Sequence, residues 1–138
     1  MLENLQDYFT PEYQFSLEKI AYNKLPASTN DYTLQYHDTI KADIDNNLHA
    51  RISLTRAVLF EPEGVFSLIV SFEAILTFDS TKYNEIDWST VNLAEEFMKG
   101  GGFILYNLSS RISGLIASIT SSFGQPPVVL PIISNTDR

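Results

Sequence analysis

The side chains that most often carry catalysis or bind metals are few in this chain and lie far apart. The two histidines, His37 and His49, fall on separate predicted strands, with no pairing at metal-ligand spacing. Asp43 and Asp45 flank a predicted turn, which is typical of solvated carboxylates rather than of an acid–base pair. No Gly-x-Ser-x-Gly motif surrounds any of the serines. These residues therefore predict that the protein is not an enzyme, binds no metal and needs no cofactor.

Three consecutive glycines, Gly100 to Gly102, resemble a phosphate-binding loop only superficially. In such a loop the lysine follows the glycines and a Ser or Thr follows the lysine, so that both reach the phosphate and its magnesium ion. Here Lys99 precedes the glycines instead. The conformational freedom of glycine at the end of a helix therefore predicts a hinge or a helix boundary.

Composition predicts one globular domain over residues 1–138. Of the 138 residues, 44% are apolar and 19% are charged, which is ordinary for a folded protein. Nine Lys and Arg against 17 Asp and Glu give a net charge of −8, and the basic residues form no run. An acidic chain repels phosphate backbones, which disfavours nucleic-acid binding. Cysteine is absent, which excludes disulfides and thiolate metal sites.

The sequence predicts a soluble, cytoplasmic protein. Residues 1–15 have no basic start and no apolar run of signal-peptide length. The most apolar stretch, 103–119, is interrupted by Asn107, Arg111 and several serines, which argues against membrane insertion.

The longest periodic segment, 103–121, predicts an amphipathic helix. Its apolar residues recur at spacings of three and four, which places them on one stripe. The stripe consists of Ile104, Leu105, Leu108, Ile112, Leu115, Ile116 and Ile119. Because this stripe is wide for so short a chain, we expect the helix to pack against a sheet and also against another subunit.

Four segments with alternating apolar residues precede this helix and predict strands. They lie at 13–22, 33–44, 48–55 and 65–78. The apolar phase of the first shifts near Lys19, which predicts a bulge. Turn residues at 45–47 and 61–64 predict hairpins. In the second, Pro62 is expected to fix φ early in the turn and Gly64 to relax the backbone at its end.

The remaining segments are predicted from their polarity and their prolines. Residues 1–10 are expected to be loose, and 79–89 form a polar connection that contains Trp88, either covering the end of the core or anchoring an interface. A short helix is expected over 91–99. Residues 125–138 form an extended tail, which prolines keep out of a helix.

The last predicted strand is apolar on both faces. Phe66, Phe72 and Phe78 share one face with other apolar residues, whereas Ile69 and Ile75 lie on the other. A single helix covers only one face of a sheet, so the second face needs another subunit, the tail or a bound polypeptide.

The order of these elements resembles that of SecB, the family of tetrameric export chaperones. Strands come first, followed by a glycine-interrupted segment, a serine-rich helix and a tail of the form FxxPxxxLP at 123–131. The residues that carry the resemblance are Phe15-Ser16-Leu17, Glu63-Gly64, Phe66, Val70, Ile75, Leu76, Leu105-Tyr106, Arg111-Ile112-Ser113, Leu115, Phe123 and Leu130-Pro131. The resemblance covers most of the chain.

The resemblance implies an α+β fold, with a four-stranded antiparallel sheet packed on one long helix, in a homodimer or homotetramer. It also implies an ATP-independent chaperone that binds extended, non-native polypeptides in apolar grooves. The groove residues expected on this basis are Phe66, Ile69, Phe72, Ile75, Phe78, Leu130, Ile132 and Ile133. The residues expected to let helices of two subunits approach closely are Ser110, Ser113, Gly114 and Ala117.

The chain also departs from the SecB pattern. That family has a second helix after the proline segment, whereas this sequence ends at Arg138, so a divergent group is expected, such as the chaperones that accompany toxin–antitoxin systems. Acidic residues that dock the translocation motor SecA in the export chaperones correspond here to Lys24, Ser28 and Ile69. Docking of that motor is therefore not implied.

A second hypothesis has the same fold but a different use. An oligomeric interaction protein, such as an antitoxin-like or regulatory subunit, would bind one specific folded partner through a shape-specific patch. A small-ligand carrier would need a closed pocket with convergent polar groups, and the sequence identifies none.

Overall fold

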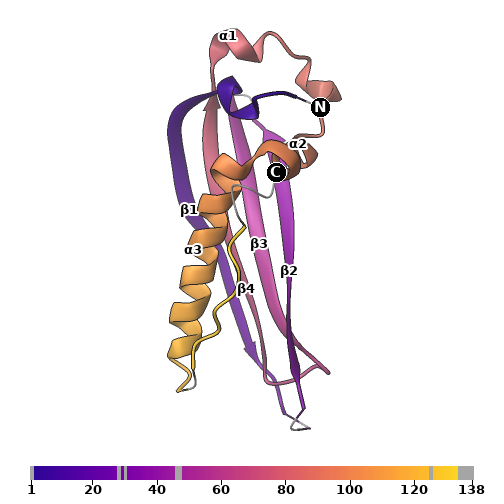
Figure 1. Ribbon diagram of the computed structural model, residues 1–138, viewed down its shortest axis with the longest axis vertical. Coiled ribbons are helices and arrows are strands. Elements are labelled where there is room, and N and C mark those ends of the chain that lie inside the picture. The colour runs from indigo at the N-terminus through magenta and orange to yellow at the C-terminus, as the bar shows by residue number, and fades with distance from the viewer. Residues whose placement is uncertain (1, 28, 30, 46–47, 125, 134–138) are drawn as a thin grey trace.

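In a computed structural model, the chain forms one long sheet with a long helix laid along one face (Figure 1). The structure describes residues 2–27, 29, 31–45, 48–124 and 126–133. The strands are β1 (Phe9–Lys24), β2 (Thr33–Ile44), β3 (His49–Glu61) and β4 (Phe66–Phe78). The helices are η1 (Leu5–Tyr8), α1 (Ser80–Tyr83), η2 (Trp88–Thr90), α2 (Leu93–Gly100) and α3 (Gly102–Ser121).

The sheet is antiparallel throughout, in the order β1-β4-β3-β2. This confirms the predicted α+β fold of four strands and one long helix. The predicted bulge is also present: Leu17 pairs with Phe72 and Lys19 with Ser71, so Glu18 is an extra residue in β1. A one-residue insertion reverses the side-chain phase, which keeps apolar residues on the helix side at both ends of β1.

The core lies between the sheet and α3. The predicted apolar stripe of the helix faces the sheet, and Ile104, Leu105, Leu108, Ile112 and Ile116 are fully buried. They pack against alternate residues of the two central strands, including Ile52, Leu54, Leu68, Val70 and Leu76, which are also fully buried. Burial of each such side chain contributes about 1.5–3 kcal/mol relative to exposure. The helix is therefore positioned by apolar burial over β3 and β4.

The triple glycine forms the predicted helix boundary. Helix α2 ends at Gly100, α3 begins at Gly102, and Gly101 lies between them. The backbone N–H of Gly101 donates to Phe97 O (2.8 Å), and a Cβ at Gly101 would lie 2.7 Å from Phe97 Cδ1. Glycine is therefore required here by close packing.

The hairpin between β3 and β4 forms where the sequence predicts it, but a different residue adopts the unusual conformation. Val65, not Gly64, has a positive φ of 68°. Gly64 is needed for a close approach instead, because a Cβ there would lie 2.7 Å from Tyr32 Cε1. A β-branched residue rarely adopts a left-handed conformation, so this turn stores strain.

Two segments are more ordered than the sequence predicts. In the N-terminal segment expected to be loose, Leu5 is 3% exposed within η1 and β1 already starts at Phe9. The polar connection at 79–89 contains α1, which Asp79 caps by accepting from two backbone N–H groups. Trp88 packs on Phe78 in this connection, so it covers the end of the core. The predicted turn residues Asn46 and Asn47 lie outside the described residues.

Gly101→Ala is expected to lower the free energy of unfolding by about 1–3 kcal/mol, because a methyl group there overlaps Phe97. The matched control is Gly114→Ala in α3, where an added Cβ meets nothing within 4 Å. Replacing glycine inside a helix should stabilise the fold by up to about 1 kcal/mol. Urea unfolding followed by circular dichroism measures both changes, and equal midpoints for the two variants would contradict this packing.

Candidate functional site

The face of the sheet turned away from α3 is polar and internally bonded. Thr55 Oγ1 donates to Ser71 Oγ (2.9 Å), which in turn donates to Glu18 Oε1 (2.6 Å). Arg51 Nη1 donates to Glu73 Oε1 (3.2 Å) on the same face. The polar side chains named here therefore already have partners within this face.

The helix side is organised around Arg56, which is only 2% exposed. Its Nε and Nη2 donate to the two carboxylate oxygens of Asp38 on β2 (2.7 and 2.9 Å). Its Nη1 donates to Ser113 Oγ on α3 (2.9 Å) and to the carbonyl of Pro131 in the tail (2.8 Å). The guanidinium also lies 4.6 Å from the centre of the Tyr36 ring. One buried side chain therefore joins two strands, the helix and the tail.

The tail segment 126–133 runs back along α3 in the direction opposite to the helix (Figure 1). Val128 N donates to Thr120 Oγ1 (2.8 Å), and Ile133 N donates to Ser109 Oγ (2.7 Å). The segment has no helix or strand. We call the surface beneath it, formed by α3 and by Arg56 of β3, the tail groove.

An apolar hollow of about 510 Å³ lies on the helix side where α3 ends. Four aromatic rings surround it in a chain of contacts, with centroid distances of 5.1–5.9 Å. These are Tyr22, Phe60, Phe66 and Phe123. The strained Val65, the tail residues Pro126 and Val128, and the polar residues Lys24 and Thr120 complete the lining. We call this the aromatic hollow.

Strand β1 continues the apolar surface from the aromatic hollow along one edge of the sheet. Leu17, Ile20 and Tyr22 are 49%, 45% and 44% exposed and all lie on the helix side, opposite Phe72, Val70 and Leu68. Phe123 is 37% exposed beside them. Large apolar side chains gathered in this way mark interaction surfaces on soluble proteins.

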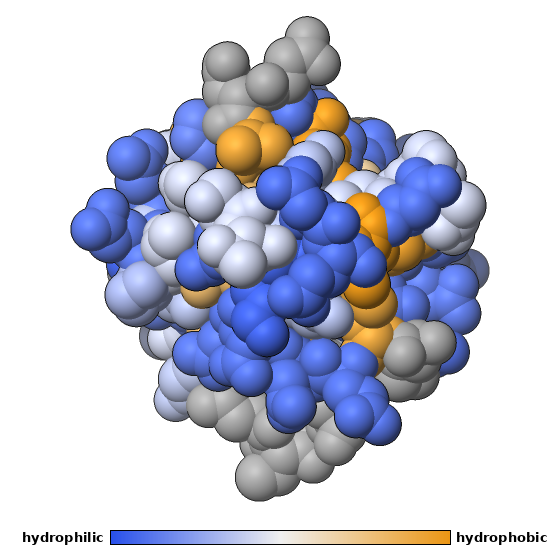
Figure 2. Space-filling view, turned by 90° about the horizontal axis from the view of Figure 1, so that it is seen from above, coloured by the Kyte–Doolittle hydropathy of each residue, from blue (hydrophilic) through white to orange (hydrophobic). Residues whose placement is uncertain are grey.

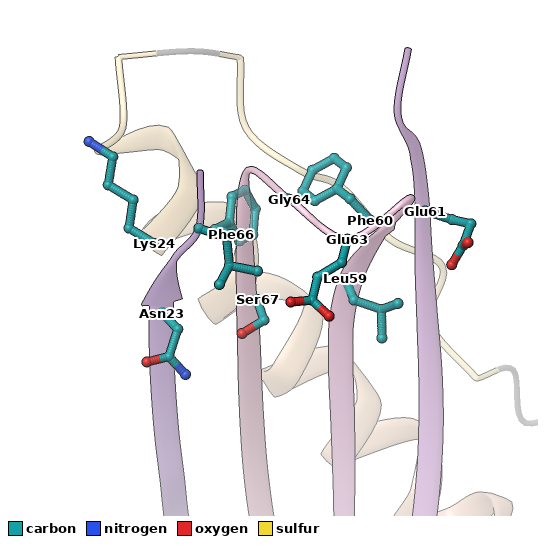
Figure 3. A pocket seen from close by; sticks show the side chains of 10 residues that line it. Asn23, Lys24, Leu59, Phe60, Glu61, Glu63, Gly64, Phe66 and Ser67 are labelled. Carbon is teal, nitrogen blue, oxygen red and sulfur yellow. The ribbon is translucent and has the colours of Figure 1, made fainter. Parts of the chain in front are cut away.

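Other surfaces of the molecule are more polar. A second hollow of about 500 Å³ lies at the hairpin end, where Asn23, Ser67 and Glu63 lie side by side on the face away from α3 (Figure 3). At the opposite end, the surface seen along the long axis is largely hydrophilic, with an apolar band along one side (Figure 2). The helix side therefore holds the broadest candidate binding surface among the described residues.

The structure divides the groove residues predicted from the sequence between the two faces of the sheet. Phe66, Phe72 and Phe78 lie on the helix side, and of these Phe66 and Phe78 are buried in the core. Ile69 and Ile75 are half-buried on the opposite face. In the tail, Leu130 and Ile133 are half-buried against the core and Ile132 is 41% exposed. Only the tail residues and Phe66 border the tail groove or the aromatic hollow.

The residues predicted to lie between helices are also divided. Gly114 is exposed, and Ser110 and Ala117 are half-buried. Ser113 is 7% exposed and faces Arg56 and Pro131, so it does not share the outward surface of α3.

Sequence reasoning missed Arg56, Asp38 and the exposed apolar residues of β1. Arg56 could have been found from the sequence, because every second residue around it is apolar and it lies between Leu54 and Val58 in that series. An arginine in such a row predicts either an edge or a buried ion pair.

Neither histidine lies in a cluster of metal-ligating side chains. His37 is exposed on β2, and His49 Nδ1 lies 3.5 Å from Asp45 Oδ2. No group of three or more His, Cys, Asp or Glu side chains in the described part of the chain is arranged to hold a metal ion. None of the helices in that part has both the length and the apolar character to cross a membrane.

Of the three positions matched to motor-docking residues, Lys24 ends β1 and Ile69 lies half-buried on the polar face. Ser28 lies outside the described residues. Lys24 also lines the aromatic hollow, whereas Ile69 lies on the opposite face of the sheet.

No protein-family model and no curated protein matches the chain. Among solved structures, its fold is similar to that of the Mycobacterium tuberculosis Rv1957 SecB-like chaperone, in complex with a ChAD peptide from the Rv1956 HigA1 antitoxin. The TM-score is 0.57 with 17% sequence identity, over 88% of each chain. The fold is SecB-like. At this identity the likeness extends to the fold alone, and function depends on the site.

Arg56→Met is expected to lower the free energy of unfolding by about 3 kcal/mol, because it leaves the Asp38 carboxylate without its two guanidinium donors and takes the shorter of two hydrogen bonds from the Pro131 carbonyl. Arg51→Met on the opposite face is the matched control. Arg51 is 46% exposed in its ion pair with Glu73, and its loss should cost less than about 1 kcal/mol. Urea unfolding measures both, and equal losses would contradict the assigned role of Arg56.

Proposed function

We propose that this protein is an ATP-independent holdase chaperone, a divergent member of the SecB-like group, that binds extended, non-native polypeptides, with preproteins as one class of client. The observation that supports this most directly is the apolar surface left open on the helix side. It combines the aromatic hollow with the exposed residues Leu17, Ile20 and Tyr22. The solved SecB-like chaperone of similar fold is in complex with a peptide, which supports polypeptide binding as the use of this surface.

Binding on such a surface is passive. An unfolded client buries its own apolar side chains against the aromatic rings, and each contact is weak. Several contacts along one client add up through their linkage, so long unfolded chains are retained better than short ones. The net charge of −8 keeps the loaded complex soluble.

We further propose that subunits associate through the edge of the sheet and through α3. Strand β1 is an edge strand of 16 residues, and an edge with exposed apolar side chains is a template for pairing. The outward surface of α3 has Gly114 and half-buried Ala117, which permit close helix contact. This arrangement would give a dimer through β1 and a tetramer through α3, in a cytoplasmic protein that does not depend on the export motor.

The alternative is an interaction protein with one specific folded partner. The structural neighbour binds a peptide from an antitoxin, which favours considering a dedicated partner for this chain as well. A purification that returns one stoichiometric folded partner would favour this function, whereas a spread of unrelated unfolded chains would favour the holdase.

The purified protein should delay the refolding of a chemically denatured, slowly folding client at equimolar amounts and without nucleotide. Phe123→Ser should weaken this delay, because it removes one ring of the aromatic hollow. Met98→Ser is the matched control, since Met98 is 54% exposed but lies on α2, at the other end of α3 (Figure 1). Unaltered refolding in the presence of the wild-type protein would rule out general holding activity.

Native mass spectrometry at low micromolar concentration tests the assembly. Ile20→Lys places a charge on the edge strand and should yield monomers, whereas Gly114→Leu adds bulk to α3 and should yield dimers. Neither change should alter monomer folding, because both positions are exposed. A wild-type protein that is already monomeric would contradict both interfaces.

A further inference from the structure

The tail is bound through atoms that every polypeptide has. Its hydrogen bonds to the rest of the chain join the backbone groups of Val128, Pro131 and Ile133 to side chains of Thr120, Arg56, Ser113 and Ser109. The tail contributes only its main chain to these bonds. Recognition of this kind places few demands on the sequence of the segment that is bound.

The side chains of the tail alternate between the groove and the solvent. Val128, Leu130 and Ile133 pack against the core, whereas Val129 and Ile132 are 76% and 41% exposed. Residues 126–133 are apolar and carry no charge. The tail groove therefore fits an extended, uncharged segment with branched aliphatic residues at positions i, i+2 and i+5.

We propose that the tail groove accepts an extended apolar segment of another polypeptide in exchange for the chain's own tail, which acts as a built-in competitor. This inference rests on the proposed function. It specifies where the client binds and what regulates that binding. An incoming segment would place a carbonyl at Arg56 Nη1 and amide groups at Ser109 Oγ and Thr120 Oγ1. It would replace Leu130 and Ile133 with apolar side chains of its own.

Competition with the tail makes the groove select long unfolded chains over short segments. The tail is tethered to the end of α3, so its effective concentration at the groove is about millimolar. A partner can bind only to molecules from whose groove the tail has left. Its apparent affinity is therefore its intrinsic affinity multiplied by the fraction of molecules with an open groove. Single short segments therefore lose to the tail. Long unfolded chains, which also contact the aromatic hollow beside Pro126 and Val128, gain enough from several contacts to displace it.

The probe is a fluorescently labelled peptide with the sequence of residues 126–133, and the readout is its anisotropy with the full chain. In L130D/I133D, charges at the two half-buried positions loosen the tail and open the groove. The peptide should bind this variant about tenfold or more tightly than the wild type, because more of the groove is open. In the matched control V129D/I132D, the same charges lie on exposed positions, and peptide binding should equal that of the wild type. Equal binding to all three proteins, or binding to none, would overturn the proposal.

A second measurement covers the case in which L130D/I133D does not fold. The chain has no cysteine, so V129C carries a single spin label at an exposed position of the tail. Millimolar unlabelled peptide should convert part of the spectrum to a mobile form as the tail leaves the groove. An unchanged spectrum at saturating peptide would overturn the proposal. Neither measurement uses a folding client, so failure of tail exchange is distinguishable from failure of holding activity.

Discussion

The arrangement of the helix side depends on one buried guanidinium. A charged group with 2% exposure is tolerated only when its hydrogen bonds are satisfied, and Arg56 finds its acceptors in Asp38, Ser113 and Pro131. These acceptors come from β2, α3 and the tail, which are distant in the sequence. The hydrogen bonds of this one side chain therefore hold the tail and β2 to a helix that apolar burial already places over β3 and β4.

The candidate function follows from the apolar residues on the helix side of the sheet that α3 and the tail leave uncovered. A single 20-residue helix packs over β3 and β4, and the tail supplies the rest of the cover near Arg56. Part of strand β1 and the aromatic hollow remain open, and Leu17, Ile20, Tyr22 and Phe123 are exposed there. The opposite face is polar and bonded within itself, so the two faces are suited to different tasks.

Local patterns predicted most of the fold. Strand β2 spans the predicted residues, and the phase shift in β1 marks the bulge at Glu18. The stripe on 103–121 predicted which side of α3 is buried. These features depend on how apolar residues repeat along a single helix or strand, and that repeat can be read from the sequence.

Other features depend on contacts between distant segments. Ser113 was expected to face a second helix, but the buried guanidinium of Arg56 draws it toward the sheet. Turn chemistry predicts the relaxed conformation at Gly64, whereas Val65 has the positive φ and Gly64 instead permits the close approach of Tyr32. Residues 126–133 have no helix, as their prolines predict, but their path follows from hydroxyl groups on α3 that no local rule singles out.

We propose that non-native polypeptides bind on the helix side of the sheet. A photoreactive benzoylphenylalanine tests this directly when it replaces Phe123 in one protein and Thr39, which is exposed on the opposite face, in another. Illumination with a denatured client should cross-link the client to position 123 and leave position 39 free. Cross-linking at position 39 alone, or at neither position, would contradict the account.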